Sequence, residues 1–285
     1  MRIILAASES VGYECLKALL DRHREVVAVV VHHSKSGVSL STARVTSLAR
    51  EAGLPLYEVV NINDPGLIGE LALLRPDILF NIAFVQIYQS AILRLPRLGC
   101  INFHPGPLPR YGGSNGWVWA IINGEAEYGV CFHYMREKVD AGDIVARDTF
   151  PISAEETGRS LLSTCFRSGA MLFQKLLTDF EENRLAPIHQ DLTQRSYYYN
   201  RVPNGGFIDF SWDAAKICRF VRALTFSPFP NPLSPPMLSF GDAKLVVTKA
   251  AKSAEIEVNP KHRPGTVIRV DETGVLVSAG DGSVI

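Results

Sequence analysis

Apolar runs of strand length alternate with amphipathic stretches through the first hundred residues. The runs predict buried strands at Arg2–Ala7, Glu25–Val31, Leu54–Val59, Asp77–Ala83 and Leu98–Phe103, and the stretches between them predict helices at Gly12–Leu20, Leu40–Ala52, Pro65–Leu74 and Tyr88–Leu93. Strands that alternate with helices are typical of a parallel sheet covered by helices. The sequence therefore predicts an α/β fold with a Rossmann-like, doubly wound, mostly parallel sheet.

The pattern changes after residue 114. A short helix is expected at Asn115–Asn123, followed by two strands at Tyr128–Met135 and Ile144–Phe150. Thr157–Phe180 carries apolar residues at helical spacing. This spacing predicts a long amphipathic helix that lies across the sheet.

A smaller second domain is expected near the end of the chain. From about residue 186 the composition turns polar and tyrosine-rich, which indicates a linker, placed at 196–206. A helix at Ala214–Leu224 and short strands at 236–240, 243–249, 265–270 and 274–278 follow, a pattern typical of a β-barrel-like (OB-like) unit. The expected organisation is a main domain at 1–195 and a β-rich domain at 207–285. A strand-like start at Ser283–Ile285 leaves open whether the second domain is truncated.

Bulk composition narrows the class of partner. The 285 residues include 29 basic and 29 acidic side chains, and 47% of them are hydrophobic. A formal charge of zero argues against a nucleic acid or an anionic membrane and favours a small-molecule substrate.

Five scattered cysteines without a C-x-x-C pair are typical of buried free thiols in a reducing compartment. No leader pattern follows Met1 and no long apolar stretch occurs, so a cytoplasmic protein is expected. The sequence does not indicate an oligomeric state, and a homodimer is one option.

The stretch Cys100–Gly113 carries the strongest candidate chemistry. Side chains two apart on a strand point the same way, so Asn102 and His104 are expected side by side at a strand end. Three prolines and three glycines follow between residues 105 and 113. They predict a rigid, exposed loop rather than a helix or regular sheet.

A carboxylate can join this pair from the turn between the two strands that follow. That turn contains Asp140 and Asp143, and either could reach the His104 strand end or simply shape the turn. No Ser, Cys or Thr is placed for His104 to activate as a nucleophile. A base, an amide donor and a carboxylate suit the attack of an external amine on a carbonyl, because they stabilise an oxyanion and receive the ammonium proton.

Two common cofactor classes are not expected. The first turn, Ser8–Gly12, contains a single glycine and lacks G-x-G-x-x-G, which argues against NAD and FAD. Such a sheet can still bind a ligand at the carboxyl ends of its strands, where the strand order reverses. His32 and His33 follow a strand, but no third ligand is spaced to complete a metal site, so no metal is expected.

Several motifs resemble the N10-formyltetrahydrofolate-dependent formyltransferases, and together they span most of the chain. They are Asn102–Pro109, Val139–Ile144, Trp119–Glu125, Phe207–Trp212, Phe220–Leu224 and Pro264–Ile268. Within that family the chain looks more similar to the sugar-nucleotide formyltransferases than to methionyl-tRNA formyltransferase. The Asn-x-His motif and the distant Asp-x-Gly motif are specific as a pair and weak singly.

The resemblance implies a folate-dependent N-formyltransferase with Asn102, His104 and Asp140 as catalytic residues and N10-formyltetrahydrofolate as formyl donor. Cofactor binding is implied for Phe84, Val85, Gln86, Ile87, Val139, Ala141, Gly142 and Asp143. Substrate binding is implied for Ser8, Glu9, Ser10, Pro107, Tyr111, Gly112 and Trp117. A core position is the simpler alternative for Trp117.

The chain departs from the family pattern in the catalytic loop. The family loop often reads His-x-Ser-Leu-Leu-Pro, whereas Gly106 and Pro107 replace Ser and Leu here, as in several sugar enzymes. A basic residue common after the tyrosine is replaced by Gly112, so its contact to an anionic substrate lacks an equivalent.

The resemblance leaves the acceptor amine open. A UDP- or dTDP-linked amino sugar is favoured, with methionyl-tRNA as the alternative. Residues 201–285 hold 10 Lys/Arg against 8 Asp/Glu, which supplies few charges for tRNA phosphates. A catalytically silent folate- or nucleotide-binding module is a second alternative.

Overall fold

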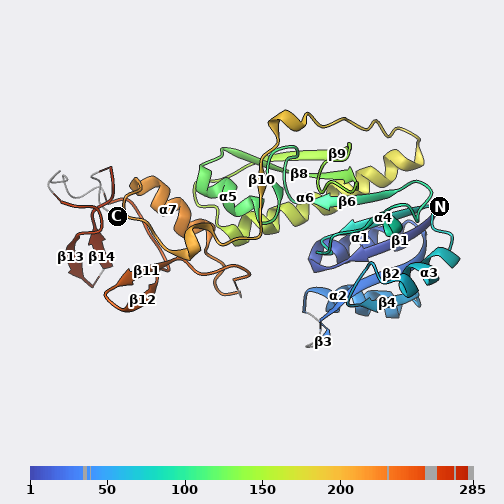
Figure 1. Cartoon of the computed structure of the whole chain (residues 1–285), viewed down its shortest axis with the longest axis horizontal. Coiled ribbons are helices and arrows are strands. Elements are labelled where there is room, and N and C mark those ends of the chain that lie inside the picture. Colours follow the sequence, from blue (N-terminus) through green and yellow to red (C-terminus); the bar gives the residue numbers. More distant parts are fainter. Residues whose placement is uncertain (35–36, 39, 230, 254–261, 273, 282–285) are drawn as a thin grey trace. The chain divides into compact units, whose positions relative to one another are not determined.

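The computed structural model describes residues 1–34, 37–38, 40–229, 231–253, 262–272 and 274–281 (Figure 1). These residues group into two compact units that interleave along the chain. The first comprises Met1–Gly112, Gly129–Thr149 and Thr164–Tyr197, and the second comprises Gly113–Tyr128, Phe150–Ser163 and Tyr198–Ile285. The division at 1–195, 196–206 and 207–285 that the sequence suggests stays a prediction.

A mostly parallel sheet forms the centre of the first unit. Its strands are β1 (Arg2–Ala7), β2 (Glu25–Ser34), β3 (Gly37–Val38), β4 (Leu56–Val59), β5 (Ile78–Ile82), β6 (Cys100–His104), β8 (Glu127–Tyr134) and β9 (Ile144–Pro151). Their order is β3-β2-β1-β5-β6-β8-β9, with β4 also paired to β2. Neighbouring strands are parallel along the spatial series β4, β2, β1, β5 and β6. The strand β8 runs antiparallel to β6. The predicted α/β fold is confirmed, and the strand order reverses between β1 and β5.

Helices connect the parallel strands, as the alternating pattern predicted. They are α1 (Glu9–Asp21), α2 (Leu40–Glu51), α3 (Pro65–Leu73) and α4 (Ser90–Leu93), and the long α6 (Gly158–Glu181) follows β9. Asp64 caps α3 by accepting a hydrogen bond from the Leu67 N–H at 3.0 Å, with Pro65 in the first turn. The helix α4 is two residues shorter at its start than predicted.

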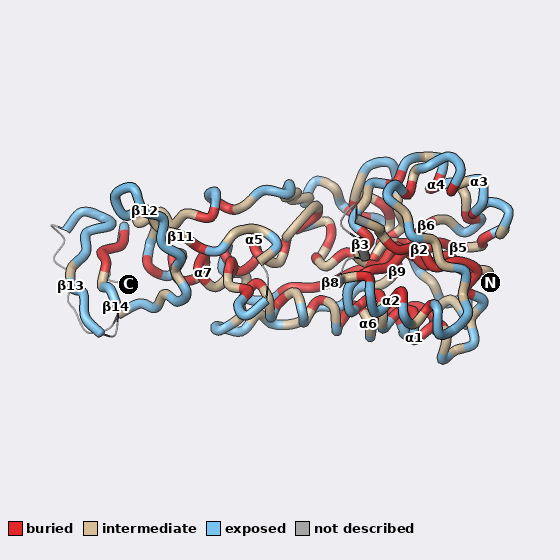
Figure 2. The backbone as a smooth tube through the Cα atoms, turned by 90° about the horizontal axis from the view of Figure 1, so that it is seen from below, coloured by how far each residue is buried: buried red, intermediate tan, exposed pale blue. Residues whose placement is uncertain are grey.

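The two faces of the sheet have separate apolar cores. On one face Leu79 and Cys100 belong to a buried cluster with Leu71 of α3 and Ile92 of α4. On the other face Phe80 packs edge-on against Phe173 of α6, with ring centroids 5.0 Å apart. Figure 2 shows these central strands as the continuous buried part of the chain. Because β6 alternates, its polar residues continue the face that Cys100 begins.

The second unit gathers segments that are distant in sequence. It contains α5 (Gly116–Asn123), a 3₁₀ turn at Pro203–Gly206, and α7 (Ala214–Ala223). The Arg219 Nε–H of α7 donates to the Ile122 carbonyl of α5 at 3.1 Å, and Trp119 stacks on Tyr198 with centroids 5.1 Å apart. Such contacts place α5 with the C-terminal residues, which explains the interleaving.

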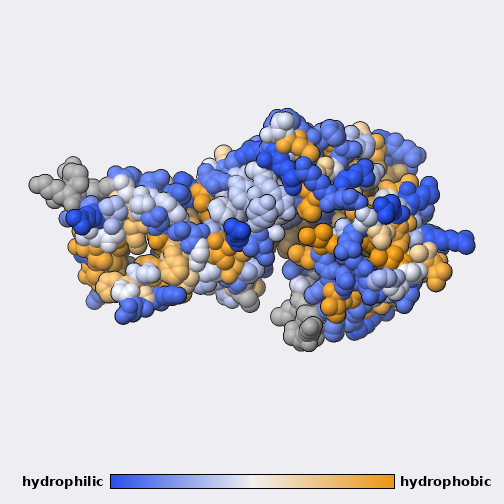
Figure 3. All heavy atoms as spheres, viewed as in Figure 1, coloured by the Kyte–Doolittle hydropathy of each residue, from blue (hydrophilic) through white to orange (hydrophobic). Residues whose placement is uncertain are grey.

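The C-terminal residues form two antiparallel hairpins. They are β11 (Met237–Phe240) with β12 (Ala243–Val246), and β13 (Val267–Asp271) with β14 (Gly274–Val277). The hairpins belong to separate sheets rather than to one closed barrel in the part of the chain that the structure describes. Phe240, Val270 and Val275 are exposed on these hairpins. Figure 3 shows apolar surface on this part of the chain. The strand start expected at Ser283–Ile285 lies outside the described residues.

Three further expectations concern the whole chain. All five cysteines are free thiols and all are buried. Among the described residues, no helix is both long enough and apolar enough to span a bilayer. His33 Nδ1 lies 3.4 Å from Glu58 Oε2, and within the described ranges no three potential ligands gather around a metal position.

Candidate active site

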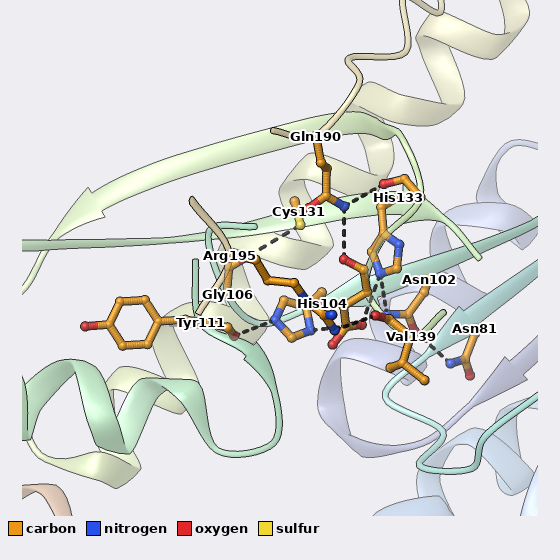
Figure 4. A network of polar contacts seen from close by, with 12 residues as sticks. Asn81, Asn102, His104, Gly106, Tyr111, Cys131, His133, Val139, Gln190 and Arg195 are labelled. Atoms are coloured by element: carbon orange, nitrogen blue, oxygen red, sulfur yellow. Dashed lines mark hydrogen bonds and ion pairs between the residues drawn. The ribbon is translucent and has the colours of Figure 1, made fainter. Parts of the chain in front are cut away.

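Asn102 and His104 lie on the same face of β6 at its carboxyl end, as strand alternation predicted (Figure 4). His104 is 5% exposed, and Asn102 is partly buried. The neighbouring strand β5 ends beside them, because Asn81 of β5 pairs in register with Asn102. The site is therefore at the edge of the sheet where parallel strands of α/β proteins place their ligands.

The tautomer of His104 is set by the backbone of the proline-rich loop. His104 Nε2 lies 2.9 Å from the Tyr111 carbonyl oxygen. A carbonyl can only accept, so Nε2 carries the hydrogen and Nδ1 of the neutral ring keeps its lone pair. Gly106 permits this approach, because a Cβ atom there would lie 2.6 Å from Nε2 and 2.9 Å from the Tyr111 oxygen.

Burial favours the neutral form of His104. Desolvation is the main cause that lowers the pKa of its imidazole, and the nearby His133 ring lowers it further. The Asp140 carboxylate and the hydrogen bond to Tyr111 act in the opposite direction. The balance leaves a neutral imidazole, which can accept a proton on Nδ1 at neutral pH.

Asp140, rather than Asp143, faces His104. Asp140 Oδ1 lies 3.8 Å from His104 Nδ1, and Asp140 is 7% exposed. Asp143 instead pairs its Oδ1 with His189 Nδ1 at 2.9 Å, in a more exposed position. The distance of 3.8 Å is too long for a hydrogen bond, so Asp140 acts on His104 by charge.

Three residues that the sequence reasoning missed hold these groups in place. His133 of β8 places Nε2 3.0 Å from Asn102 Nδ2 and 3.5 Å from Asp140 Oδ1. Gln190 donates from Nε2 to the carbonyls of Asp140 and Gly142, at 3.1 and 2.6 Å. Arg195 donates to the Val139 carbonyl at 2.9 Å. A histidine inside an otherwise apolar strand was the available signal for His133, whereas Gln190 had none.

The segment predicted to begin the linker supports the catalytic loop. The Tyr111 N–H donates to Ser196 Oγ at 2.8 Å, and the Gly112 N–H donates to the Ser196 carbonyl at 3.0 Å. Two-residue strands at Gly112–Gly113 (β7) and Tyr197–Tyr198 (β10) pair as a result. The loop thus contains a short stretch of sheet that the glycines and prolines did not predict.

The segment Phe84–Ile87, expected to contact a cofactor, has two kinds of side chain. Phe84 is buried in the core cluster beside Tyr88, and Gln86 bonds the backbone of Ile62 and Val60. Val85 and Ile87 are 91% and 70% exposed. Only these two offer open apolar surface to a ligand.

The expected substrate residues are placed in different surroundings. Ser8 is buried and joins the ends of β1 and β5, because its N–H donates to the Ile82 carbonyl at 3.0 Å and its hydroxyl donates to the Ala83 carbonyl. Glu9 and Ser10 follow it and are exposed. Pro107 is partly exposed in the loop, and Tyr111 and Gly112 are buried. Trp117 lies in α5 of the second unit, where its indole Nε1 is buried without a hydrogen-bond partner among the described residues.

A thiol nucleophile is disfavoured at this site. Cys131 of β8 pairs in register with His104, but burial raises the pKa of its thiol to about 12. Its sulfur donates instead to the Gly106 carbonyl at 3.4 Å. The fold and the site together define an α/β protein in which a buried histidine, an amide and a carboxylate meet at a strand end, a set of groups suited to acyl transfer.

Comparisons with known proteins identify the family. A formyl transferase family model matches residues 1–174, and a model of the formyl transferase C-terminal domain matches residues 202–285. The chain therefore belongs to the formyl transferase family, as its motifs predicted.

The relatives and solved structures that resemble the chain have different names and bound molecules. The chain is 33% identical to a methionyl-tRNA formyltransferase of Citrifermentans bemidjiense, across 100% of this chain and 87% of the relative. It is 30% identical to the bifunctional polymyxin resistance protein ArnA of Wigglesworthia glossinidia brevipalpis, across 94% of this chain and 40% of that protein. A solved N-formyltransferase of Helicobacter canadensis, in complex with folinic acid and dTDP-3-aminofucose, has a TM-score of 0.74 at 21% identity, covering 99% and 97% of the two chains.

Proposed function

We propose that this protein transfers a formyl group from N10-formyltetrahydrofolate to the primary amine of a nucleotide-linked amino sugar. The observation that carries the proposal is the buried cluster of Asn102, His104 and Asp140 at the carboxyl end of β6. Each group has a role in one addition–elimination reaction. The acceptor amine attacks the formyl carbon, the C–N bond to the folate N10 breaks, and that nitrogen leaves with a proton.

Asn102 stabilises the negative charge that develops on the formyl oxygen. Its Nδ2 has two hydrogens, and His133 accepts one of them. The second has no partner among the described residues and is free to donate to the oxyanion. A fixed amide of this kind costs no reorganisation when the charge develops.

His104 takes the proton of the attacking amine on Nδ1. The neutral ring is prepared for this by burial and by the hydrogen bond that fixes Nε2–H on Tyr111. Asp140 stabilises the resulting imidazolium across 3.8 Å in a site that excludes most water. His104 then returns the proton to the leaving nitrogen of the folate.

The folate is proposed to lie against the turn Val139–Asp143 and the exposed side chains of Val85 and Ile87. Those side chains offer a flat apolar contact for the pterin at the end of β5. The carbonyls of Val139, Asp140 and Gly142 already accept hydrogen bonds from Arg195 and Gln190. Pterin donors would have to share these carbonyls, which have a second lone pair each.

The charge of the chain favours an amino sugar over tRNA. The net charge is zero and residues 201–285 carry a formal +2, from 10 Lys/Arg against 8 Asp/Glu. Proteins that bind tRNA neutralise many phosphates and need a strongly basic surface. The solved structure in complex with dTDP-3-aminofucose matches the chain over nearly its whole length and supports the same choice.

Methionyl-tRNA is the second candidate acceptor. Its support is the 33% identity over the full chain to a methionyl-tRNA formyltransferase, which exceeds the identity to the solved sugar enzyme. The partly exposed basic residues of α7, Lys216, Arg219 and Arg222, are the candidates for contacts to phosphates.

A competition assay separates the candidates. The purified protein and N10-formyltetrahydrofolate are offered initiator methionyl-tRNA together with a panel of UDP- and dTDP-linked 3-amino and 4-amino sugars, and each formylated product is measured by mass. We expect a nucleotide sugar to be the preferred product. Formylated tRNA with every sugar unmodified would replace the amino sugar by tRNA. Folate binding without release of tetrahydrofolate under any condition would instead indicate a silent binding module.

A further inference from the structure

A row of polar side chains crosses three strands of the sheet and includes Asn102. Asn81 of β5, Asn102 of β6 and His133 of β8 occupy paired register positions. Residues directly opposite one another on neighbouring strands point to the same face and contact each other. We call Tyr88, Asn81, Asn102 and His133 the polar row, because the Tyr88 hydroxyl extends it at the β5 end. Figure 4 labels the other three residues.

The hydrogen bonds of the polar row run in one direction. The Tyr88 hydroxyl donates to Asn81 Oδ1 at 3.1 Å, and Asn81 Nδ2 donates to Asn102 Oδ1 at 2.7 Å. Asn102 Nδ2 then donates to His133 Nε2 at 3.0 Å. At the far end His133 Nδ1 lies 3.0 Å from the Tyr134 carbonyl, which can only accept. Nδ1 therefore carries the hydrogen, and Nε2 of the neutral ring is the acceptor that Asn102 requires.

The two amides can also be arranged in the reverse direction, but only if His133 carries its hydrogen on Nε2, which leaves the Tyr134 carbonyl without a donor from Nδ1. An amide can exchange its oxygen and nitrogen by a half-turn, so Asn81 and Asn102 could both turn and donate towards Tyr88. Asn102 would then present its oxygen to His133 and its NH₂ to Asn81. In that orientation its nitrogen is turned to the Asn81 side, and the oxyanion faces a carbonyl oxygen instead of an N–H donor. The groups at the two ends of the row decide between the directions. The Tyr88 hydroxyl can donate to Asn81 in one direction and accept from it in the other, so His133 is the end group that selects the direction.

We propose that His133 is a positioning residue that holds the Asn102 amide in the orientation that donates to the formyl oxygen. This role deepens the formyl transfer proposed above and rests on it. The position of Asp140 adds to the argument, since its Oδ1 lies 3.5 Å from the same His133 Nε2. A hydrogen on Nε2 would be drawn to this carboxylate, and Asn102 would lose its acceptor. The bond from Nδ1 to Tyr134 prevents this arrangement in the neutral ring.

Two substitutions of His133 test whether its acceptor atom Nε2 orients the Asn102 amide. His133→Gln places an amide oxygen near the position of Nε2 and retains an acceptor for Asn102. His133→Asn places its amide near Nδ1, so it retains a polar group of similar burial but lacks the acceptor. Asn81→Asp is an independent variant, because its carboxylate only accepts and forces Asn102 to donate towards β5 while His133 stays intact.

Kinetics and thermal unfolding form the first measurement. His133→Asn and Asn81→Asp are expected to lower kcat by about 10- to 100-fold. The upper value is the typical effect of removing one oxyanion donor. Both KM values should stay within about twofold, because the donor acts mainly in the transition state. His133→Gln should recover most of kcat at a melting temperature similar to that of His133→Asn. A wild-type kcat for His133→Asn, or equal losses in the Gln and Asn variants, would overturn the proposal.

Nuclear magnetic resonance of the Asn102 side chain gives a readout that does not depend on the acceptor. The ¹⁵N–¹H pair of its amide is assigned by its disappearance in Asn102→Asp. His133→Asn and Asn81→Asp should shift this resonance, and His133→Gln should leave it close to wild type. An unshifted resonance in both of the first two variants would overturn the role of His133. Because no turnover is needed, a failure of the proposed acceptor does not affect this result.

Discussion

Removal of the Gln190 side chain tests whether the polar segment after α6 belongs to the active site. Gln190 is 3% exposed and its Nε2 donates to the carbonyls of Asp140 and Gly142. These carbonyls belong to the turn that carries the Asp140 carboxylate, which we propose to be catalytic. In Gln190→Leu both hydrogen bonds are lost while the side-chain volume is nearly kept.

The expected loss of stability in Gln190→Leu follows from the two carbonyls that lose their donor. An intramolecular hydrogen bond contributes about 1 kcal/mol net, and a buried carbonyl left without a partner costs about 1–3 kcal/mol. Gln190 Oε1 is itself buried without a partner among the described residues, and its removal offsets part of the loss. We expect Gln190→Leu to lower the free energy of unfolding by about 2–3 kcal/mol.

The substitution should also slow the reaction. A displacement of a catalytic group by about 1 Å can reduce turnover by about 100-fold. Asp140 is fixed through its own backbone by Gln190, so we expect kcat to fall by about 10- to 100-fold at a temperature well below unfolding. Gln190→Glu should be at least as damaging, because a carboxylate cannot donate and adds a negative charge beside Asp140.

The assay combines steady-state kinetics with urea unfolding of each variant. Gln194→Leu is the matched control, since it makes the same substitution in the same segment at an exposed side chain that bonds only to Asp191 at 2.9 Å among the described residues. It should behave like the wild type in both measurements. A normal kcat in Gln190→Leu, with or without a loss of stability, would refute the argument that Gln190 positions the catalytic turn.

Two further predictions concern His104 and its loop. Because burial lowers the pKa of His104 and the neutral ring is the base, the acid limb of kcat/KM should lie below the ordinary histidine value of about 6.5. Asp140→Asn removes the charge that raises this pKa, so it should move the limb to still lower pH as well as lower the rate; an unmoved limb would exclude His104 as its origin. Gly106→Ala should reduce kcat by at least about tenfold, because its Cβ would lie 2.6 Å from His104 Nε2. Gly69→Ala, in α3 with no atom within 4 Å of the new Cβ, is the control and should keep full activity with up to about 1 kcal/mol more stability.

Local sequence rules were sufficient for the sheet and for the central pair. Apolar runs separated by amphipathic stretches predicted β1, β2, β4, β5 and β6 but not the two-residue β3, and alternation along one strand placed Asn102 and His104 together. The same alternation could have drawn attention to His133, which interrupts an apolar strand. Its relation to Asn102 depends on β8 lying next to β6 in a particular register, and that register is not encoded locally.

Long-range pairing accounts for what the sequence could not provide. Gln190 is one polar residue in a polar stretch, and it reaches the catalytic turn only because Ile188 pairs with Ile144. The assignment of α5 to the C-terminal unit likewise depends on a contact between Ile122 and Arg219, 97 positions apart. A change in composition can indicate a linker, but it does not reveal which remote backbone groups that segment will bind.

Backbone strain connects these remote segments to the chemistry. Ala83, Tyr111 and Asp140 have φ angles of 55°, 58° and 55°, a left-handed conformation that costs roughly 1–3 kcal/mol for a residue with a Cβ atom. In each case the unusual backbone aims a group into the site region: Tyr111 turns its carbonyl to His104, Asp140 turns its carboxylate to the same ring, and Ala83 closes the end of β5 against β1.

Each strained residue is also held by a hydrogen bond between its backbone and a polar side chain distant in sequence. Ser8 donates to the Ala83 carbonyl, Ser196 accepts from the Tyr111 N–H, and Gln190 donates to the Asp140 carbonyl. None of the strained residues is a glycine, so residue type gives no local indication of the conformation. Two of the three supporting side chains, Gln190 and Ser196, come from one short segment of the chain. We therefore expect substitutions in this segment to disturb the Tyr111 and Asp140 conformations, and with them the proposed chemistry.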